Sequence, residues 1–481
     1  MTRLRCLGLA LILVAVMASS PHAEGHDATL SVGSEYTVKF LDVASDPHGD
    51  AMVSNGTIAF HGEHCVSWSR ACRIFVHNII TGETWDTGYA GTLGDFQYPY
   101  LVFEHEEHFL GDLDGDGYSY DRMLVVYDVV ARNGHMVAEN FTWSASVSDG
   151  RITYNKVESY NQVDYNKDGD LFDVAVFLYD ISERSETLAG VGIFPLLVGQ
   201  YLFWYCQGND LCSLDVVTHR SLAAKLPWRY PNFHPEMRSG DGDTMAIAVY
   251  DEGDYDGNGV KGEHLLASFN MSTGAFKVHL DAGGIAFLDL SLSGGKVLAY
   301  QDYRYRNNDP NYPQGYFVYD LATGETTNLS TEPNLQYPLF HANSVVANVN
   351  VWCVSPPEFD CHPRSNPRVV LHNIRTGETR DLSACCVVRE WSGAYDGDTI
   401  VLTHNEHVLG VDFNNDGDLE DEFVGYATTL LGNQRPLLTD ESHHHPSVSP
   451  IGPILLCFAV VASLGLTVVV LAPRLRKRRV T

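Results

Sequence analysis

The chain has 481 residues, of which 44% are hydrophobic and 11% aromatic, so it is long enough to bury a substantial core. Its 61 acidic residues outnumber the 31 Lys and Arg residues, and seven of those basic residues lie near the two termini. The other 24 leave the rest of the chain with a formal charge near −37, which argues against a nucleic-acid partner and against binding to an anionic membrane surface.

The chain begins with the pattern of a secretory signal. Arg3 and Arg5 precede an apolar run that ends at Ala18, and small residues follow it. We therefore predict a signal peptide over residues 1–20, with cleavage between Ala18 and Ala23. A secreted chain meets oxidising surroundings, in which cysteines form disulfide bonds.

Four acid-rich loops between residues 112 and 421 share one internal spacing. Each has side-chain oxygens at positions 1, 3 and 5, a Gly at position 6 and a carboxylate at position 10. Calcium binds roughly six to eight oxygens, which alternate residues of a tight turn can present, and the backbone carbonyl at position 7 is the usual next ligand. The predicted ligands, loop by loop, are Asp112, Asp114, Asp116, Tyr118 and Asp121; Asp164, Asn166, Asp168, Asp170 and Asp173; Asp254, Asp256, Asn258, Val260 and Glu263; and Asp412, Asn414, Asp416, Asp418 and Asp421.

Two other interpretations of these loops are possible. An EF-hand closes with Glu at position 12 and is flanked by helices, whereas strand-like runs flank these loops, so a hairpin calcium loop describes them better. A turn rich in Asp, Asn and Gly can also bind nothing, since those residues favour turns. Four copies in one register favour calcium, and we predict four calcium sites.

A pair of strands recurs along the chain and includes the loops. One strand follows a turn that contains Gly, and the next strand ends in Asp or Asn. In three copies, whose second strands are 74–78, 316–320 and 369–373, a Thr-Gly-Glu-Thr turn comes soon after the strand. Successive copies are 35 to 55 residues apart, and such units are typical of propeller blades. We predict an all-β fold, with a single β-propeller over residues 30–440. It would have about eight four-stranded blades, or alternatively seven, and Tyr36–Leu41 would supply a strand that helps to close the ring.

These motifs resemble the TolB-like/WD40-like β-propeller family, in which a Gly turn, an apolar strand, a strand ending in Tyr-Asp and a Thr-Gly-Glu turn recur. The resemblance covers roughly residues 50–440 and implies a scaffold for protein or glycan contact, while related propellers accompany peptidase or lyase chemistry. The calcium loops depart from this pattern and resemble those of integrin-like FG-GAP propellers. In that second family the closing acid comes one residue earlier and a Phe-Gly…Gly-Ala-Pro frame surrounds the loop, and neither feature is clear in this chain.

Eight cysteines lie outside the two terminal segments. Six of them form three close pairs, each between the two strands of a unit that lacks a calcium loop: Cys65 and Cys72, Cys206 and Cys212, and Cys353 and Cys361. We predict a local disulfide in each pair, so that this hairpin is tied either by calcium or by a disulfide. The unit around residues 307–313 has neither feature, and the pairing of Cys385 and Cys386 stays open.

Sequons mark candidate glycosylation sites on a secreted chain. We predict glycosylation at Asn55, Asn140 and Asn328. A fourth sequon, at Asn270, lies at a strand end within the repeat, which makes it the weakest candidate.

No catalytic motif stands out. The sequence lacks a Gly-x-Ser-x-Gly elbow, a His-Glu-x-x-His zinc helix and a P-loop. The segments His105–His108 and His404–His407 precede two of the loops, where they are candidates for a transition-metal site, and Glu107 and Glu406 are candidates to add calcium ligands. Residues three apart on a strand face opposite ways, which favours plain polar positions beside a loop.

The C-terminal part has the pattern of a membrane anchor. A polar linker over 441–450 precedes Ile451–Ala472, which has no charged residue and is long enough for a transmembrane helix. The basic tail 473–481 follows, and basic residues stay in the cytoplasm, so we predict a single-pass membrane protein with its N-terminal part outside the cell. The alternatives are a buried core helix or a sorting signal that is later removed.

Two classes of function remain. We favour a membrane-anchored cell-surface propeller with structural calcium, which acts as a scaffold for an extracellular protein or glycan rather than as an enzyme. The alternative is an extracellular hydrolase or lyase whose active site lines the propeller channel.

Overall fold

The computed structural model describes residues 29–32, 36–45, 51–62, 72–106, 122–206, 210–224, 238–251, 263–281, 286–302, 315–329, 335–353, 361–383, 394–405 and 422–428. The chain divides into two compact units, residues 1–432 and 433–481, and the described residues all belong to the first. The predicted signal peptide, linker, transmembrane helix and basic tail lie outside the described residues, as do Cys385 and Cys386. No helix in the described part is long and apolar enough to cross a membrane.

The regular elements among the described residues are strands in antiparallel sheets, apart from one short helix, α3 (Glu158–Asn161). The first seven-stranded sheet consists of β3 (Ala51–Ser54), β4 (Thr57–His61), β5 (Cys72–Asn78), β6 (Glu83–Gln97), β7 (Tyr100–Glu106), β8 (Arg122–Asp128) and β9 (Asn133–Glu139). The second consists of β10 (Phe141–Ser148), β11 (Arg151–Val157), β12 (Val174–Asp180), β13 (Ser185–Val198), β14 (Tyr201–Cys206), β15 (Asp210–Asp215) and β16 (Arg220–Ala224).

The described residues also form three four-stranded sheets and one five-stranded sheet. The four-stranded sheets are β17 (Arg238–Asp241), β18 (Thr244–Asp251), β19 (Glu263–Asn270) and β20 (Ala275–Asp281); β21 (Ala286–Ser293), β22 (Lys296–Asp302), β23 (Gly315–Asp320) and β24 (Thr326–Asn328); and β25 (Leu335–His341), β26 (Ser344–Cys353), β27 (Cys361–Asn373) and β28 (Thr379–Ser383). The five-stranded sheet has the order β1 (Thr29–Val32), β2 (Tyr36–Ser45), β31 (Glu422–Thr428), β30 (Thr399–Asn405) and β29 (Ala394–Tyr395).

Each seven-stranded sheet contains two four-stranded units that share one long strand. The first part of β6 pairs with β5 and its last part with β7, and β13 joins β12 to β14 in the same way. Gly91 pairs with both neighbours of β6, and a Cβ atom there would lie 1.8 Å from the carbonyl oxygen of Glu104. Only glycine fits such a close approach of two backbones.

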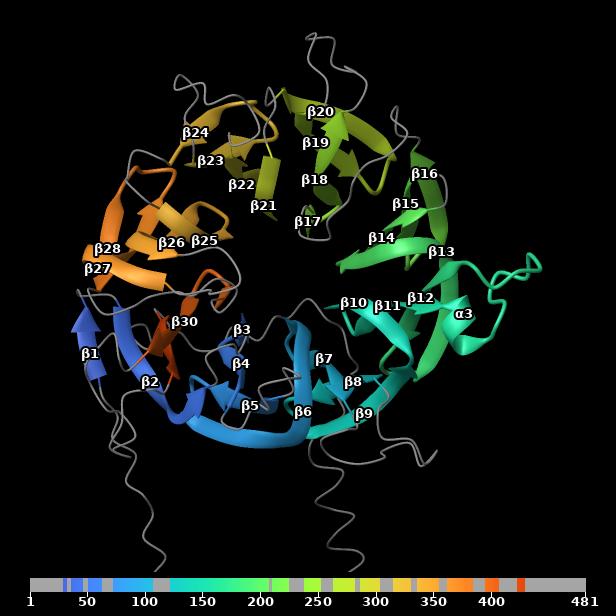
Figure 1. The fold of residues 1–481 in the computed structure, drawn as a ribbon, viewed down its shortest axis with the longest axis horizontal. Helices are drawn as coiled ribbons and strands as arrows, with labels where there is room; N and C mark the ends of the chain where they lie inside the picture. Colours follow the sequence, from blue (N-terminus) through green and yellow to red (C-terminus); the bar gives the residue numbers. More distant parts are fainter. Residues whose placement is uncertain are drawn as a thin grey trace, which may run out of the picture. The chain divides into compact units, whose positions relative to one another are not determined.

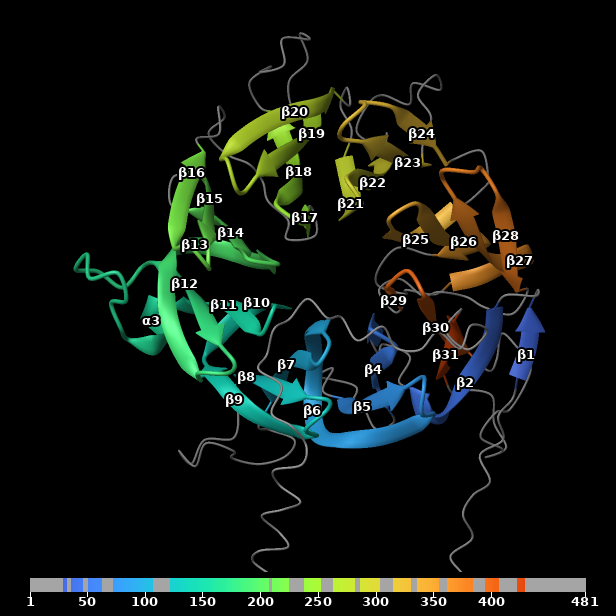
Figure 2. The same cartoon turned by 180° about the vertical axis from the view of Figure 1, so that it is seen from behind.

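The first strands of successive units pack against one another around a common centre. Strand β3 contacts β6, and β6 contacts β10, which contacts β13; β13 contacts β17, and the series continues through β21, β25 and β29. Strand β29 in turn contacts β3, which closes the cycle. Figures 1 and 2 show this arrangement from its two sides. The described part of the chain therefore has a propeller-like all-β fold.

An N-terminal strand completes the sheet formed by the last strands of the described chain. Strand β2 pairs with β31, from Thr37 opposite Thr428 to Ser45 opposite Glu422. This pairing confirms the predicted closing strand at Tyr36–Leu41, and β1 adds a further strand outside β2.

Neighbouring sheets pack face to face through apolar side chains. Ala246 and Leu266 of one sheet meet Val297 and Phe317 of the next in a single buried cluster. The second strand of a unit is covered on both faces, so every residue of β4 is buried. Such strands are apolar runs rather than alternating patterns, which accounts for the apolar runs in the repeat.

The Asp or Asn at the end of the third strand shapes the turn that follows. The Asn78 Oδ1 atom accepts hydrogen bonds of 3.0 Å from the N–H groups of both Ile80 and Thr81. The fourth residue after Asn78 is Gly82, which has a φ of +71°. Equivalent paired hydrogen bonds are made by Asp128, Asp180, Asp215, Asp320 and Asn373. The sequence repeat therefore reflects local turn chemistry as well as strand pairing.

Candidate metal site

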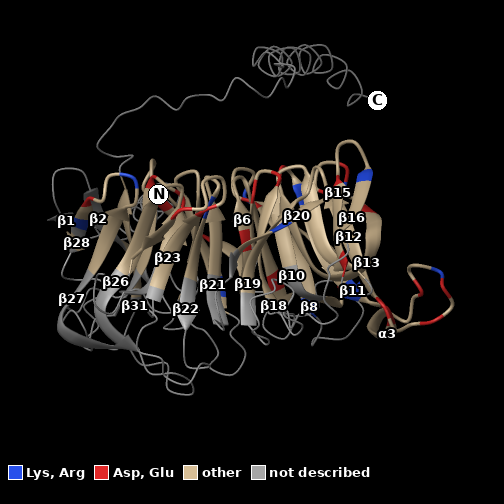
Figure 3. Ribbon diagram, turned by 90° about the horizontal axis from the view of Figure 1, so that it is seen from above, with Lys and Arg blue, Asp and Glu red and all other residues tan. Residues whose placement is uncertain are grey.

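Of the four predicted calcium loops, Asp164–Asp173 is the one that lies wholly within the described residues. The other three lie in segments 107–121, 252–262 and 406–421, outside the described residues, except that Glu263 begins β19. Their ligands therefore stay predictions. The described loop joins β11 to β12, which pair from Arg151 opposite Asp180 to Val157 opposite Val174. The single turn of α3 lies between β11 and the loop, and Figure 3 shows the acidic residues of this segment in red.

The first acid of the loop holds the turn. The Asp164 Oδ1 atom accepts a hydrogen bond from the N–H of Asp168 at 3.2 Å, and Oδ2 accepts one from the N–H of Gly169 at 3.0 Å. Gly169 has a φ of +100°, a conformation that favours glycine. The predicted role of Gly at position 6 is therefore confirmed in this loop.

The side chains at positions 3, 5 and 10 converge. The Asn166 amide donates hydrogen bonds to Asp168 Oδ2 at 3.0 Å and to Asp173 Oδ2 at 2.6 Å. Hydrogen bonds from the N–H of Asp170 and from the Asn166 amide lower the pKa of the Asp168 carboxyl. The Asn166 Oδ1 atom accepts a hydrogen bond of 3.0 Å from the Asp168 N–H. A half-turn of the amide gives up this bond and presents the oxygen to the two carboxylates' side, so that all three residues can offer oxygens to one cation.

A buried glutamate joins this cluster. Carboxylate oxygens of Glu158, Asp170 and Asp173 all lie within 4.8 Å of one another, and Glu158 is fully buried. Like charges this close repel one another unless a cation or hydrogen bonds compensate. The loop motif predicted Asp173 as a side-chain ligand and Asp170 through its backbone carbonyl, but it missed Glu158, which precedes the loop by six residues. The donor set of carboxylate and amide oxygens suits a hard divalent cation such as Ca²⁺.

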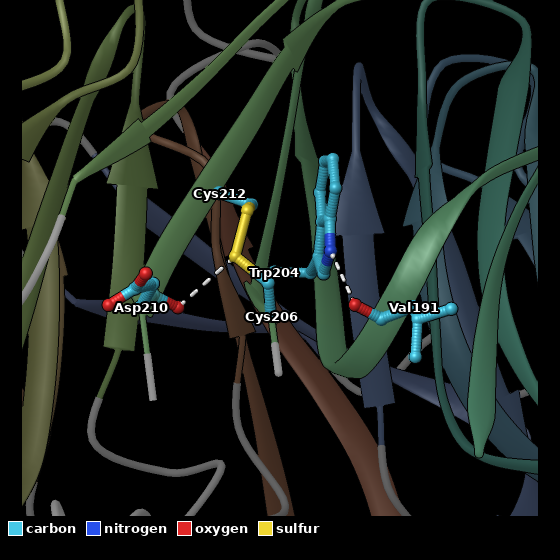
Figure 4. The surroundings of a disulfide bond; sticks show 5 residues. All are labelled: Val191, Trp204, Cys206, Asp210 and Cys212. Carbon is cyan, nitrogen blue, oxygen red and sulfur yellow. Dashed lines mark hydrogen bonds between the residues drawn. A yellow bond between two sulfur atoms is a disulfide. The ribbon is translucent and has the colours of Figure 1, made fainter. Parts of the chain in front are cut away.

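A disulfide occupies the corresponding hairpin of the next unit. Cys206 and Cys212 are bonded between β14 and β15, with their Cα atoms 5.8 Å apart, as predicted (Figure 4). Beside them, the Trp204 indole donates a hydrogen bond of 3.2 Å to the Val191 carbonyl.

The other two predicted pairs are described in part. Cys72 is also disulfide-bonded, whereas Cys65 lies outside the described residues. Cys353 lies opposite Cys361 in the backbone pairing of β26 with β27, but the side chains of this pair lie outside the described residues. The disulfide of this last pair stays a prediction.

The predicted glycosylation sites are all exposed. Asn55, Asn140 and Asn328 have exposed side chains, so a glycan can be accommodated there, although its presence stays a prediction. The Asn270 side chain differs, because its amide donates to Asp243 at 3.0 Å and its oxygen accepts from the N–H of Thr273 at 2.9 Å. These hydrogen bonds agree with the expectation that Asn270 is the weakest candidate for glycosylation.

The histidine-containing segment before the first loop is described only at its start. His105 is fully buried in β7, and its Nδ1 lies 2.6 Å from the Ala90 carbonyl oxygen. This environment fits a residue of the packed core. Glu107 and His108 lie outside the described residues, as do the side chain of His404 and all of Glu406 and His407.

No family model matches the sequence, and no curated protein matches it. Among solved structures, the chain is similar to the β-propeller domain of the Trilobed protease from Pyrococcus furiosus, with 10% identity and a TM-score of 0.40 over 69% of this chain and 95% of that one. It is similar to oligogalacturonate lyase from Vibrio parahaemolyticus, with 8% identity and a TM-score of 0.42 over 83% and 96% of the two chains. TolB from Acinetobacter baumannii gives 11% identity and a TM-score of 0.31 over 79% and 78%. These likenesses say nothing of activity, and the propeller-like fold follows from the strand order of this chain.

Proposed function

We propose that this chain is a membrane-anchored cell-surface β-propeller of eight blades. In this proposal calcium sites tie its hairpins and the rim serves as a scaffold for an extracellular protein or glycan. The membrane anchor rests on the apolar segment 451–472 and the basic tail after it, and the extracellular location also on the signal at 1–20. A formal charge near −37 outside the termini suits a solvated surface that carries bound cations.

The number of blades is supported by the shared strands. Because β6 and β13 each serve two units, the two seven-stranded sheets supply four groups of four strands. The three four-stranded sheets supply three more, and the last group consists of β29, β30, β31 and β2. This count favours eight blades over seven.

The observation that carries the calcium proposal is the convergence of Asn166, Asp168 and Asp173 on one place beside Glu158 and Asp170. A structural role is favoured because the Cys206–Cys212 disulfide ties the same hairpin in the next unit. Calcium that replaces a covalent link is a permanent part of the fold rather than a signal.

The test is a calcium titration of the purified full-length chain, read by calorimetry and by thermal unfolding. We expect four calcium ions per chain and a higher melting temperature in calcium than in EDTA. Calcium at about 100 times its Kd adds about 2.7 kcal/mol per site to the free energy of unfolding. The absence of both heat and a melting shift would contradict the proposal.

A pair of variants assigns one of these sites to the described loop. Asp168→Asn removes a converging carboxylate and should reduce the stoichiometry from four to three. Glu183→Gln is the matched control, because Glu183 is an exposed acid on the turn after β12 and outside the cluster. It should leave the stoichiometry at four.

A further inference from the structure

The Glu158 carboxylate contacts both the beginning and the end of the described loop. Its Oε1 atom accepts hydrogen bonds from the N–H of Tyr165 at 2.7 Å and of Asn166 at 3.3 Å. Its Oε2 atom accepts one from the N–H of Asp173 at 3.4 Å. The Glu158 N–H also donates to the Asp173 carbonyl oxygen at 3.0 Å, so the two residues face each other across the hairpin.

This arrangement orders the loop through hydrogen bonds that the chain itself makes. A fully buried carboxylate is costly unless it is hydrogen-bonded, and here three backbone N–H groups compensate it. These N–H groups belong to positions 2, 3 and 10, so one side chain holds the ends of the loop together. Two of these positions, Asn166 and Asp173, carry side chains that converge. A loop held in this shape loses less conformational entropy when it binds an ion.

A second predicted calcium hairpin has an acid at the same register. In the hairpin of β18 and β19, Asp251 lies opposite Glu263, which is the predicted closing ligand. Glu106 pairs with Arg122, and Asn405 pairs with Glu422. In the sequence, Glu107 follows Glu106 and Asp121 precedes Arg122. In the same way, Glu406 follows Asn405 and Asp421 precedes Glu422. The backbone pairing therefore places Asp251 opposite the closing ligand position in the β18–β19 hairpin, and in the other two hairpins the sequence alone has an acid at the corresponding position.

We propose that Glu158 is the positioning residue of the Asp164–Asp173 calcium site, and that Asp251 is its counterpart in the hairpin of β18 and β19. The inference rests on the proposed calcium function. Glu158 acts through the loop backbone, which it clamps, and its negative charge also adds to the attraction for the cation.

The experiment compares Glu158→Gln with Asp168→Asn in the full-length chain, by calcium titration and by thermal unfolding in EDTA. Glu158→Gln should weaken one of the four sites by about tenfold or more, as loss of an outer-shell partner does, while the stoichiometry stays at four. It should also lower the melting temperature in EDTA, because the three hydrogen bonds that Glu158 accepts come from groups of the chain and not from calcium. Asp168→Asn should lose one site and leave the melting temperature in EDTA nearly unchanged.

The outcomes separate the two proposals. If the wild-type chain binds four calcium ions and Glu158→Gln binds them equally well, the positioning role is wrong and the calcium function stands. If the wild-type chain binds no calcium, both fail. Asp251→Asn repeats the test in a second hairpin and replaces Glu158→Gln if that variant does not fold. The exposed Glu183→Gln control should match the wild type in both measurements.

Discussion

Four residues after the Asp or Asn that ends the third strand of a unit, the backbone adopts a positive φ. Glycine occupies this position at Gly82 and Gly324, with φ of +71° and +77°, whereas Arg132, Arg184 and His219 occupy it elsewhere, with φ of +50° to +58°. A residue with a Cβ is strained in this conformation, so the same turn is less favourable in some units than in others.

This difference predicts opposite effects of two substitutions. Arg184→Gly should raise the free energy of unfolding by up to about 1 kcal/mol, and Gly82→Ala should lower it by about the same amount. A Cβ at Gly82 meets no atom within 4 Å, so its cost is conformational and not steric. Urea denaturation measures both variants. Arg375→Gly is the control, because Arg375 is exposed and lies two residues, not four, after Asn373. Its free energy of unfolding should not rise. A rise equal to that of Arg184→Gly would contradict the explanation.

Buried His61 makes stability depend on pH. Burial lowers its pKa to about 4, against 6.5 for the free side chain, and the residue is only 3% exposed. Above pH 6.5 both the folded and the unfolded states are neutral at this position. Between pH 6.5 and 4 only the unfolded state takes up the proton, so stability falls as the pH falls, by about 3 kcal/mol in all.

The corresponding measurement is the free energy of unfolding from pH 7 to pH 4. His61→Gln removes the titrating group, so its stability should fall less steeply than that of the wild type over this range. An equal slope in the two proteins would show that His61 does not contribute. The variant is compared by slope because the substitution also changes packing in β4.

At the scale of elements, the hairpin between the second and third strands of a unit is held by different chemistry in neighbouring units. The β11–β12 hairpin has the Glu158 clamp and the acid loop, and the β14–β15 hairpin has the Cys206–Cys212 disulfide. A disulfide stabilises mainly by reducing the conformational freedom of the unfolded chain.

Replacing both Cys206 and Cys212 by Ser should lower the free energy of unfolding by about 2 kcal/mol, as expected for a short closed loop. Chemical denaturation in calcium measures the loss. Calcium stoichiometry should stay unchanged, because the two kinds of link lie in different hairpins. A loss of calcium sites in this variant would contradict that independence.

The limits of the sequence are clearest in these same elements. Loop spacing and cysteine spacing are local, so they predicted both the Asn166, Asp168 and Asp173 convergence and the Cys206–Cys212 bond. The role of Glu158 depends on the register of β11 with β12, which the loop motif does not contain. The sharing of β6 between two units depends on the close approach at Gly91, a tertiary contact with no local signal.

At the scale of the whole propeller-like unit, closure depends on a strand from the beginning of the chain. Strand β2 pairs with β31 along most of its length, so it covers an edge that would otherwise expose unpaired N–H and C=O groups. Exposed edges of this kind invite pairing with other chains.

Deleting the segment that ends at Ser45 should therefore lower the melting temperature and promote association. Thermal unfolding and size-exclusion chromatography measure the two effects. A shorter deletion that ends at Val32 removes β1 and keeps β2, so it should have a much smaller effect. Equal behaviour of the two truncated chains would contradict a closing role for β2.

The shared strand β13 has a consequence for how the molecule comes apart. One end of β13 pairs with β12, which follows the predicted calcium loop, and the other end pairs with β14, which carries Cys206, so one strand joins the two hairpins. Local opening at the loop is therefore transmitted to the disulfide hairpin through β13. These two units are expected to open as one cooperative block, and amide hydrogen exchange in β12 and β14 should report one common opening event.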